Sequence, residues 1–93
     1  MDSAKWRGLI DRHLRRKHPV LHEHLLRTGQ MNQYSEAVAD AANHRLRELL
    51  QSMREEAGLP ERPQVGDAAE WRHQMDAFYR KAVKTVRKEM IEF

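Results

Sequence analysis

Several features common in small proteins are missing from this chain or scarce in it. It has no cysteine, so disulfide scaffolds and cysteine-based zinc sites are excluded. Four glycines and three prolines in 93 residues exclude collagen-like and turn-rich all-β chains. No apolar run approaches the ~18 residues of a membrane span, and the charged N-terminus does not resemble a signal peptide. We therefore expect one domain over residues 1–93, in the cytoplasm and independent of membranes.

Positive charge is distributed unevenly. The formal net charge is only +3, but basic residues dominate the first eighteen positions, whereas residues 34–57 are acidic. Within the N-terminal segment, three arginines stand close together: Arg12, Arg15 and Arg16. Near the other end, five cations occur with no acid among them: Arg80, Lys81, Lys84, Arg87 and Lys88. Two basic clusters separated by an acidic middle indicate an anionic partner.

The first part of the chain has the apolar periodicity of two helices. The first is predicted from about Ser3 to Lys17, with Asp2 or Ser3 as its N-cap. Pro19 ends this helix, because the residue before a proline is driven out of the helical region. The same proline can occupy the first position of a second, short helix, and Gly29 is the predicted stop of that helix.

A third helix is indicated by apolar residues that advance by three or four positions from Tyr34 to Ala57. Asn32 or Ser35 is the predicted N-cap, and Gly58 is the predicted stop. Residues 59–66 then form a connection.

The last helix is predicted to begin at Asp67, with Glu70 completing a capping box. An apolar stripe follows, with nine members: Ala68, Trp71, Met75, Phe78, Tyr79, Ala82, Val86, Met90 and Phe93. On a helical wheel, the basic side chains of residues 80–88 lie mostly away from this stripe.

These elements predict an all-α protein of three to four helices. The last two, about 35 and 40 Å long, are expected to form an antiparallel hairpin because the connection between them is short, and the N-terminal helices are expected to pack against it. Helices of this length cannot both be buried in a compact chain of 93 residues. We therefore expect the Met90–Phe93 end of the stripe to lack a partner within the chain, and a homodimer or another partner to cover it.

Metal binding and catalysis find no support in the sequence. Among the six histidines, His18 and His22 have a spacing suited to a shared metal, but His18 precedes Pro19 and is expected outside the helix. No glycine-rich loop suited to phosphate and no activated nucleophile is evident. We expect neither a metal, nor another cofactor, nor an enzyme.

The basic clusters carry the functional hypothesis. In a helix, the cations of residues 80–88 span about 12 Å, a length comparable to several phosphates of one strand. With Arg12, Arg15 and Arg16 extending the footprint, they predict a small regulatory or accessory protein that binds nucleic acid through basic helix faces. The alternative is an adaptor, assembly factor or inhibitor whose hairpin docks on an acidic surface of another protein.

Overall fold

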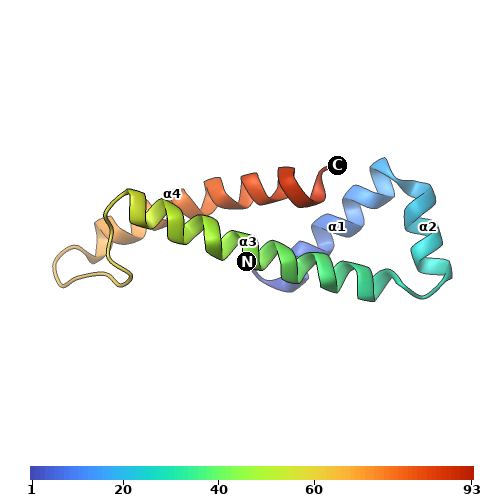
Figure 1. The fold of residues 1–93 in the computed structure, drawn as a ribbon, viewed down its shortest axis with the longest axis horizontal. Helices are drawn as coiled ribbons and strands as arrows, with labels where there is room; N and C mark the ends of the chain where they lie inside the picture. Colours follow the sequence, from blue (N-terminus) through green and yellow to red (C-terminus); the bar gives the residue numbers. More distant parts are fainter.

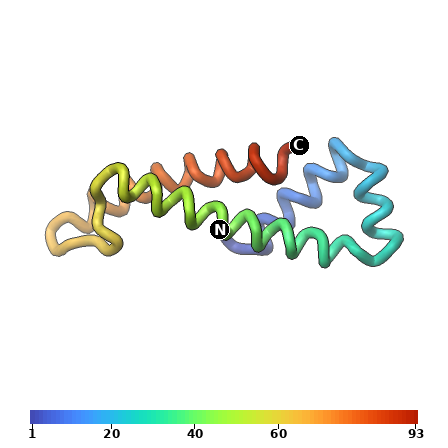
Figure 2. Tube along the Cα trace, viewed as in Figure 1, coloured from blue at the N-terminus to red at the C-terminus, as the bar shows by residue number.

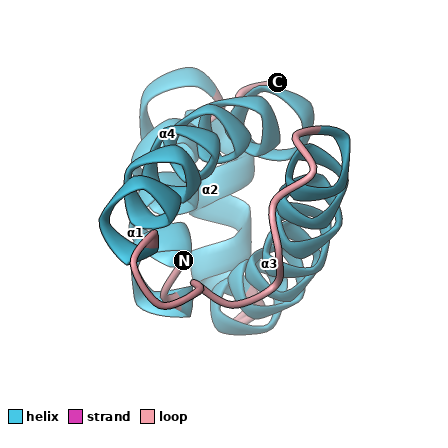
Figure 3. Cartoon of the chain, turned by 90° about the vertical axis from the view of Figure 1, so that its left-hand side faces the viewer, coloured by secondary structure: helices cyan, strands magenta, loops and turns pink.

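A computed structural model describes all residues from 1 to 93, and every regular element in it is helical (Figure 3). The elements are α1 (Ser3–Lys17), α2 (Pro19–Arg27), α3 (Met31–Glu56), α4 (Ala68–Val86) and a final π-helical turn, η1 (Arg87–Ile91). The molecule is a rod of 54 × 19 × 18 Å with a radius of gyration of 16.4 Å. A compact chain of this length would have a radius near 13 Å, so part of the rod extends beyond the core.

Helix α3 runs along most of the rod and contacts all the other helices (Figure 1). One half of it pairs antiparallel with α4, and its other half packs against α1, while α2 crosses the end of the rod. The tube in Figure 2 shows that the chain returns at α4 and ends beside α1. The predicted all-α architecture, with a long hairpin and N-terminal helices packed against it, is confirmed.

The ends of α1 and α2 follow the local sequence signals. The Asp2 carboxylate accepts a hydrogen bond from the main-chain N–H of Ala4 at 3.0 Å, as expected of an N-cap. Pro19 occupies the first turn of α2. Gly29 and Gly58 follow α2 and α3 with φ of 73° and 69°, a left-handed conformation that glycine adopts without strain.

The start of α3 differs from the prediction. The helix begins at Met31, so Asn32 and Ser35 lie inside it and neither is the N-cap. Gln30 is the capping residue, with no side-chain hydrogen bond. The Ser35 hydroxyl instead donates to the main-chain oxygen of Asn32 at 3.2 Å. Only Gln30 separates the glycine stop of α2 from the new helix, which leaves no room for a later start.

The predicted capping box of α4 is also wrong. Asp67 has φ −113° and ψ 11°, outside the extended conformation that N-caps adopt, and its side chain makes no capping bond. Glu70 accepts a hydrogen bond from the Gln74 amide at 3.0 Å, one turn further along the helix.

The last helix changes its winding after Val86. In η1, the main-chain N–H of Glu92 donates to the oxygen of Arg87 at 2.8 Å, an i→i+5 bond in place of the i→i+4 bond of an α-helix. This wider turn shifts the register of the buried face. Ala82 and Val86 are fully buried, but the next buried residue is Ile91 and not Met90.

The register shift overturns the expectation for the Met90–Phe93 end of the stripe. Ile91 is buried, and Met90 is half-buried against the core, because η1 packs on both α1 and α3. Phe93 is 60% exposed, but its ring stacks on His18. This end of the chain therefore has its partners within the molecule.

The buried core lies at the α1 end of the rod. Its ten members come from every element: Trp6, Ile10, Leu14, Leu25, Ala39, Ala42, Leu46, Ala82, Val86 and Ile91. No residue from 47 to 81 is buried, so the half of the α3–α4 hairpin away from α1, the distal half, supplies no buried side chain. Leu49, Leu50 and Met53 of α3 pack against the core but remain partly exposed. None of the helices combines the length and apolarity that crossing a bilayer requires.

Trp6 is the largest side chain in the core, and it is fully buried. Its indole N–H donates to the Asn43 side-chain oxygen at 2.6 Å, which joins α1 to the middle of α3. A buried donor left without an acceptor carries a desolvation penalty. Asn43 therefore completes the core although it is polar.

We expect Asn43→Ala to lower the free energy of unfolding by about 1–3 kcal/mol, because it leaves the indole N–H of Trp6 without its acceptor. Asn32→Ala is the matched control, since that side chain is exposed on the same helix and makes no hydrogen bond. Urea unfolding followed by circular dichroism measures both variants. Equal stability of the two would show that the Trp6–Asn43 bond contributes nothing.

A second long-range link ties α3 to η1. The Arg45 guanidinium donates to Glu89 through Nε at 3.0 Å and through Nη2 at 3.4 Å, a two-pronged ion pair. The hydrogen bond from Arg45 lowers the pKa of the Glu89 carboxyl, although partial desolvation opposes the effect. A lowered pKa in the folded state stabilises the fold above the unfolded pKa, and this contribution is lost as the pH falls through the folded pKa.

Glu89→Gln should accordingly lower the melting temperature at pH 7, and the difference from the parent should shrink below about pH 4, where glutamates take up protons. The effect is small because both side chains are partly exposed. Glu36→Gln, at an exposed and unpaired glutamate of α3, is the control. Thermal melts from pH 7 to pH 2.5 test this expectation, and a pH-independent difference would contradict it.

Candidate functional site

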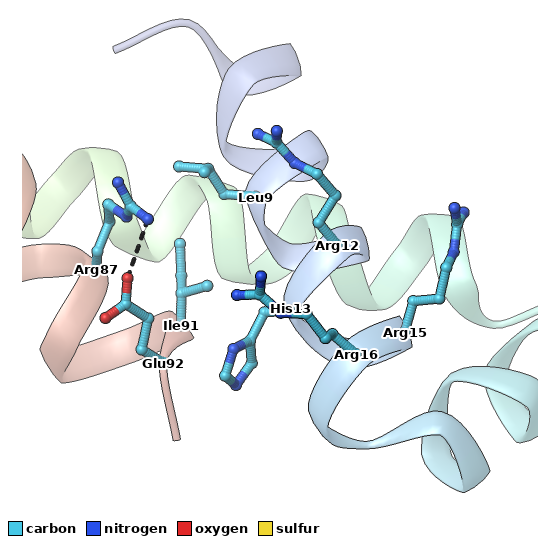
Figure 4. Close-up of a pocket in the computed structure, with 8 residues that line it drawn as sticks. All are labelled: Leu9, Arg12, His13, Arg15, Arg16, Arg87, Ile91 and Glu92. Carbon is cyan, nitrogen blue, oxygen red and sulfur yellow. Dashed lines mark ion pairs between the residues drawn. The ribbon is translucent and has the colours of Figure 1, made fainter.

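The N-terminal basic cluster and Arg87 of the C-terminal cluster line one open pocket between α1 and η1 (Figure 4). Its volume is about 720 Å³, within the range of ligand-binding pockets. Eight residues line it: Leu9, Arg12, His13, Arg15, Arg16, Arg87, Ile91 and Glu92. Four arginines and one carboxylate thus line the same pocket, and Arg87 lies more than seventy positions from the other three arginines in the sequence.

Three of these arginines come from α1. Arg12 and Arg16 are one turn apart and share a face of the helix. Neither side chain forms an ion pair. Arg12 Nε donates to the main-chain oxygen of Gly8 at 3.3 Å, and the Arg16 side chain makes no hydrogen bond. Arg15 differs, because it points away from η1 and pairs with Asp11 at 2.8 Å (Figure 4). Arg12 and Arg16 are therefore the uncompensated cations of this wall.

The fourth arginine, Arg87, is paired within η1. Its guanidinium lies 3.1 Å from the Glu92 carboxylate (Figure 4). In an α-helix, residues five positions apart differ in direction by about 140° and do not face each other. The i→i+5 bond of the π-turn brings them to the same side. The winding of η1 is therefore the cause of this ion pair.

The other predicted cations lie outside the pocket. Arg80, Lys81 and Lys84 on α4 and Lys88 on η1 are all exposed, and none forms an ion pair. Arg80, Lys84 and Arg87 share one helix face, so the row leads along α4 toward the pocket. The predicted site residues thus divide into a pocket group of four and a row of four beside it.

Four of the lining residues were not among the predicted site residues. Leu9 and Ile91 have the apolar character of core positions, and Ile91 is indeed buried beneath the pocket. Glu92 gives no signal in the sequence, because its pairing with Arg87 depends on the π-turn. His13 is half-buried on α1, and its Nε2 is bonded to a main-chain oxygen.

A cluster of three rings adjoins the pocket. His18 and Phe93 stack with centroids 4.7 Å apart and planes 22° apart, and His13 lies 5.5 Å from each of them. The Nε2 atoms of His13 and His18 donate to the main-chain oxygen of Phe93 at 3.0 and 2.7 Å. These bonds hold the exposed ring of Phe93 beside the wall of the pocket.

The remaining titratable residues do not form a metal centre. No group of three or more histidine, aspartate or glutamate side chains is arranged to hold an ion. His22 is buried, and its Nε2 lies 2.7 Å from the Asp11 carboxylate, which ties α2 to α1. His18 lies between α1 and α2 and faces Phe93, so it shares no ligand position with His22.

The fold and the pocket together define a small, basic, all-α protein with a cationic pocket where the two ends of the chain meet. The family model described as transposon-encoded protein TnpV matches residues 2–91. The chain therefore belongs to the TnpV family of transposon-encoded proteins. Comparison with curated proteins gives no match, and comparison with solved structures gives none either.

Proposed function

We propose that this chain is a non-catalytic accessory protein that binds nucleic acid in the cytoplasm through its basic row and its arginine pocket. The observation that carries the proposal is one open pocket lined by three arginines of α1 and by Arg87 of η1, in which Arg12 and Arg16 have no ion-pair partner. The basic row is defined as Arg80, Lys81, Lys84 and Lys88, and the arginine pocket as the eight residues lining the space between α1 and η1.

The basic row supports the proposal through its lack of internal partners. A solubilising helix face commonly alternates cations with acids one turn away, as Arg15 does with Asp11. None of the four side chains of the row forms an ion pair, although Asp76 precedes Arg80 and Glu92 follows Lys88 by four positions. Fixed cations on a rigid helix can replace the counterions condensed on a phosphate backbone, which gives affinity independent of base sequence.

The family is compatible with this function. A transposon is a segment of nucleic acid, and the chain belongs to a family described as transposon-encoded. This description names no ligand, so the physical argument from the basic row and the arginine pocket carries the proposal.

The triple variant Arg80→Gln, Lys84→Gln, Lys88→Gln should weaken binding to DNA and RNA oligonucleotides uniformly across sequences, by tenfold or more. Each lost phosphate contact on duplex DNA should also flatten the slope of log K against log salt by about 0.9. Fluorescence anisotropy at salt concentrations from 50 to 200 mM measures both quantities.

The control is Arg27→Gln, Arg62→Gln, Arg72→Gln, which removes the same charge from exposed sites outside the row and the pocket. It should retain most of the affinity of the parent. If the two triple variants weaken binding equally, binding depends on the net charge of the protein and not on the position of the row. Absence of binding by the parent protein to either nucleic acid would refute the proposed function and favour a protein partner with an acidic surface.

A second candidate, interaction with protein through the hairpin, is favoured by the composition of the distal half. Trp71, Met75 and Phe78 remain partly exposed there, and residues 47–81 include no buried position. We propose a second copy of this chain as the occupant of that surface, because a homodimer would extend the core along the rod. This proposal locates the homodimer interface in the distal hairpin, whereas the sequence led us to expect it at Met90–Phe93.

Light scattering over a concentration series tests the homodimer, with an expected mass twice the 11.0 kDa of the chain. Phe78→Glu should shift the mass toward that of the monomer, because it places a charge in the apolar surface. Val20→Glu, at a residue 81% exposed on α2, is the control. A mass of 11.0 kDa at all concentrations would contradict dimerisation.

A further inference from the structure

The arginines of the pocket differ in what neutralises them. Arg12 and Arg16 have no ion-pair partner, whereas Arg87 holds the carboxylate of Glu92. In Figure 4, the guanidinium of Arg16 reaches from α1 toward Ile91 and Glu92, while the Glu92 carboxylate pairs with Arg87 on the η1 side of the pocket. Glu92 is the only acidic side chain that lines the pocket.

The ion pair between Arg87 and Glu92 is of a kind that a phosphate can replace. Both side chains are more than 40% exposed, and ion pairs at that exposure contribute little to stability. A phosphate offers several acceptor oxygens and forms charge-assisted bonds with guanidinium groups. Seated in the pocket, it would engage Arg87 together with Arg12 and Arg16, which Glu92 leaves uncompensated. Glu92 is thus an internal competitor for the same place.

The ring cluster supplies a contact of another kind directly beside the phosphate position. His13 belongs both to the wall of the pocket and to the cluster, and Phe93 follows Glu92 in the chain. Phe93 is held in place through its main chain and its ring stacks on His18, while the residue as a whole is 60% exposed. Nucleic-acid bases stack on exposed aromatic rings only when they are unpaired, because both faces of a base inside a duplex are already covered.

We propose that the pocket and the ring cluster form an anchor for one unpaired nucleotide of single-stranded nucleic acid. Its phosphate lies among Arg12, Arg16 and Arg87 in place of the Glu92 carboxylate, and its base stacks on Phe93. The volume of about 720 Å³ accommodates a nucleotide-sized group. This inference rests on the proposed function and adds to it a preference for single strands.

The experiment compares a 20-nucleotide single-stranded oligothymidine with a hairpin duplex of equal phosphate number, by anisotropy at fixed salt. The parent should bind the single strand more tightly. Phe93→Leu keeps an apolar side chain but removes the aromatic face, and it should weaken single-strand binding by about fivefold or more while leaving duplex binding unchanged. Tyr79→Leu, at an exposed aromatic of α4 outside the pocket, should change neither.

Two charge variants test the phosphate position. Arg16→Gln should weaken single-strand binding severalfold, and Glu92→Gln should strengthen it severalfold by releasing Arg87. Glu36→Gln makes the same change of charge at an exposed glutamate of α3 and should leave the affinity close to that of the parent. Inorganic phosphate, added as a competitor at constant ionic strength, should reduce binding by the parent more than by Arg16→Gln if a free phosphate also fits the pocket.

The outcomes separate this inference from the proposed function. If the duplex binds as tightly as the single strand, or if Phe93→Leu and Tyr79→Leu behave alike, the anchor is wrong while nucleic-acid binding stands. If Glu92→Gln and Glu36→Gln strengthen binding equally, Glu92 is no competitor. If neither oligonucleotide binds the parent, the proposed function itself is wrong, and the anchor is wrong with it. Circular dichroism of each variant confirms that the helices are retained.

Discussion

The π-turn that follows Val86 determines how the two ends of the chain meet. It moves the buried face on by one residue, so that Ile91 enters the core between α1 and α3. The same turn brings Glu92 onto the side of Arg87 and leaves Phe93 at the surface beside His13. Continued α-helical winding would separate these groups around the helix axis. The apolar anchor, the ion pair and the exposed ring thus have one common cause.

The polar contacts complement this arrangement in two ways. The bond from Trp6 to Asn43 and the ion pair of Arg45 with Glu89 join segments about forty positions apart, and they fix α1 and η1 against α3. In the pocket between α1 and η1, Arg15 and Arg87 are also paired, whereas Arg12 and Arg16 have no ion-pair partner. The charge that remains available to a ligand there is therefore that of Arg12 and Arg16.

Much of the fold could be predicted from sequence because its signals are local. The cap at Asp2 and the stops at Gly29 and Gly58 depend on residues next to the helix ends, and all three are confirmed. The start of α3 was missed because Gln30 has no capping side chain to mark it. The π-turn was missed because hydrophobic periodicity assumes one constant pitch. Both basic clusters were found, but only the folded chain brings them together, since their meeting depends on contacts across the whole sequence.

The uneven placement of the core has a dynamic consequence. Residues 47–81 hold α3 and α4 together without a single buried side chain, whereas the α1 end is sealed by ten. Segments with few buried contacts open at a lower free energy than the rest of a protein. The amide protons of the distal hairpin in an isolated chain should thus exchange with solvent well before those of the helices around Trp6. One end of the rod is therefore stably folded, whereas the other end opens locally.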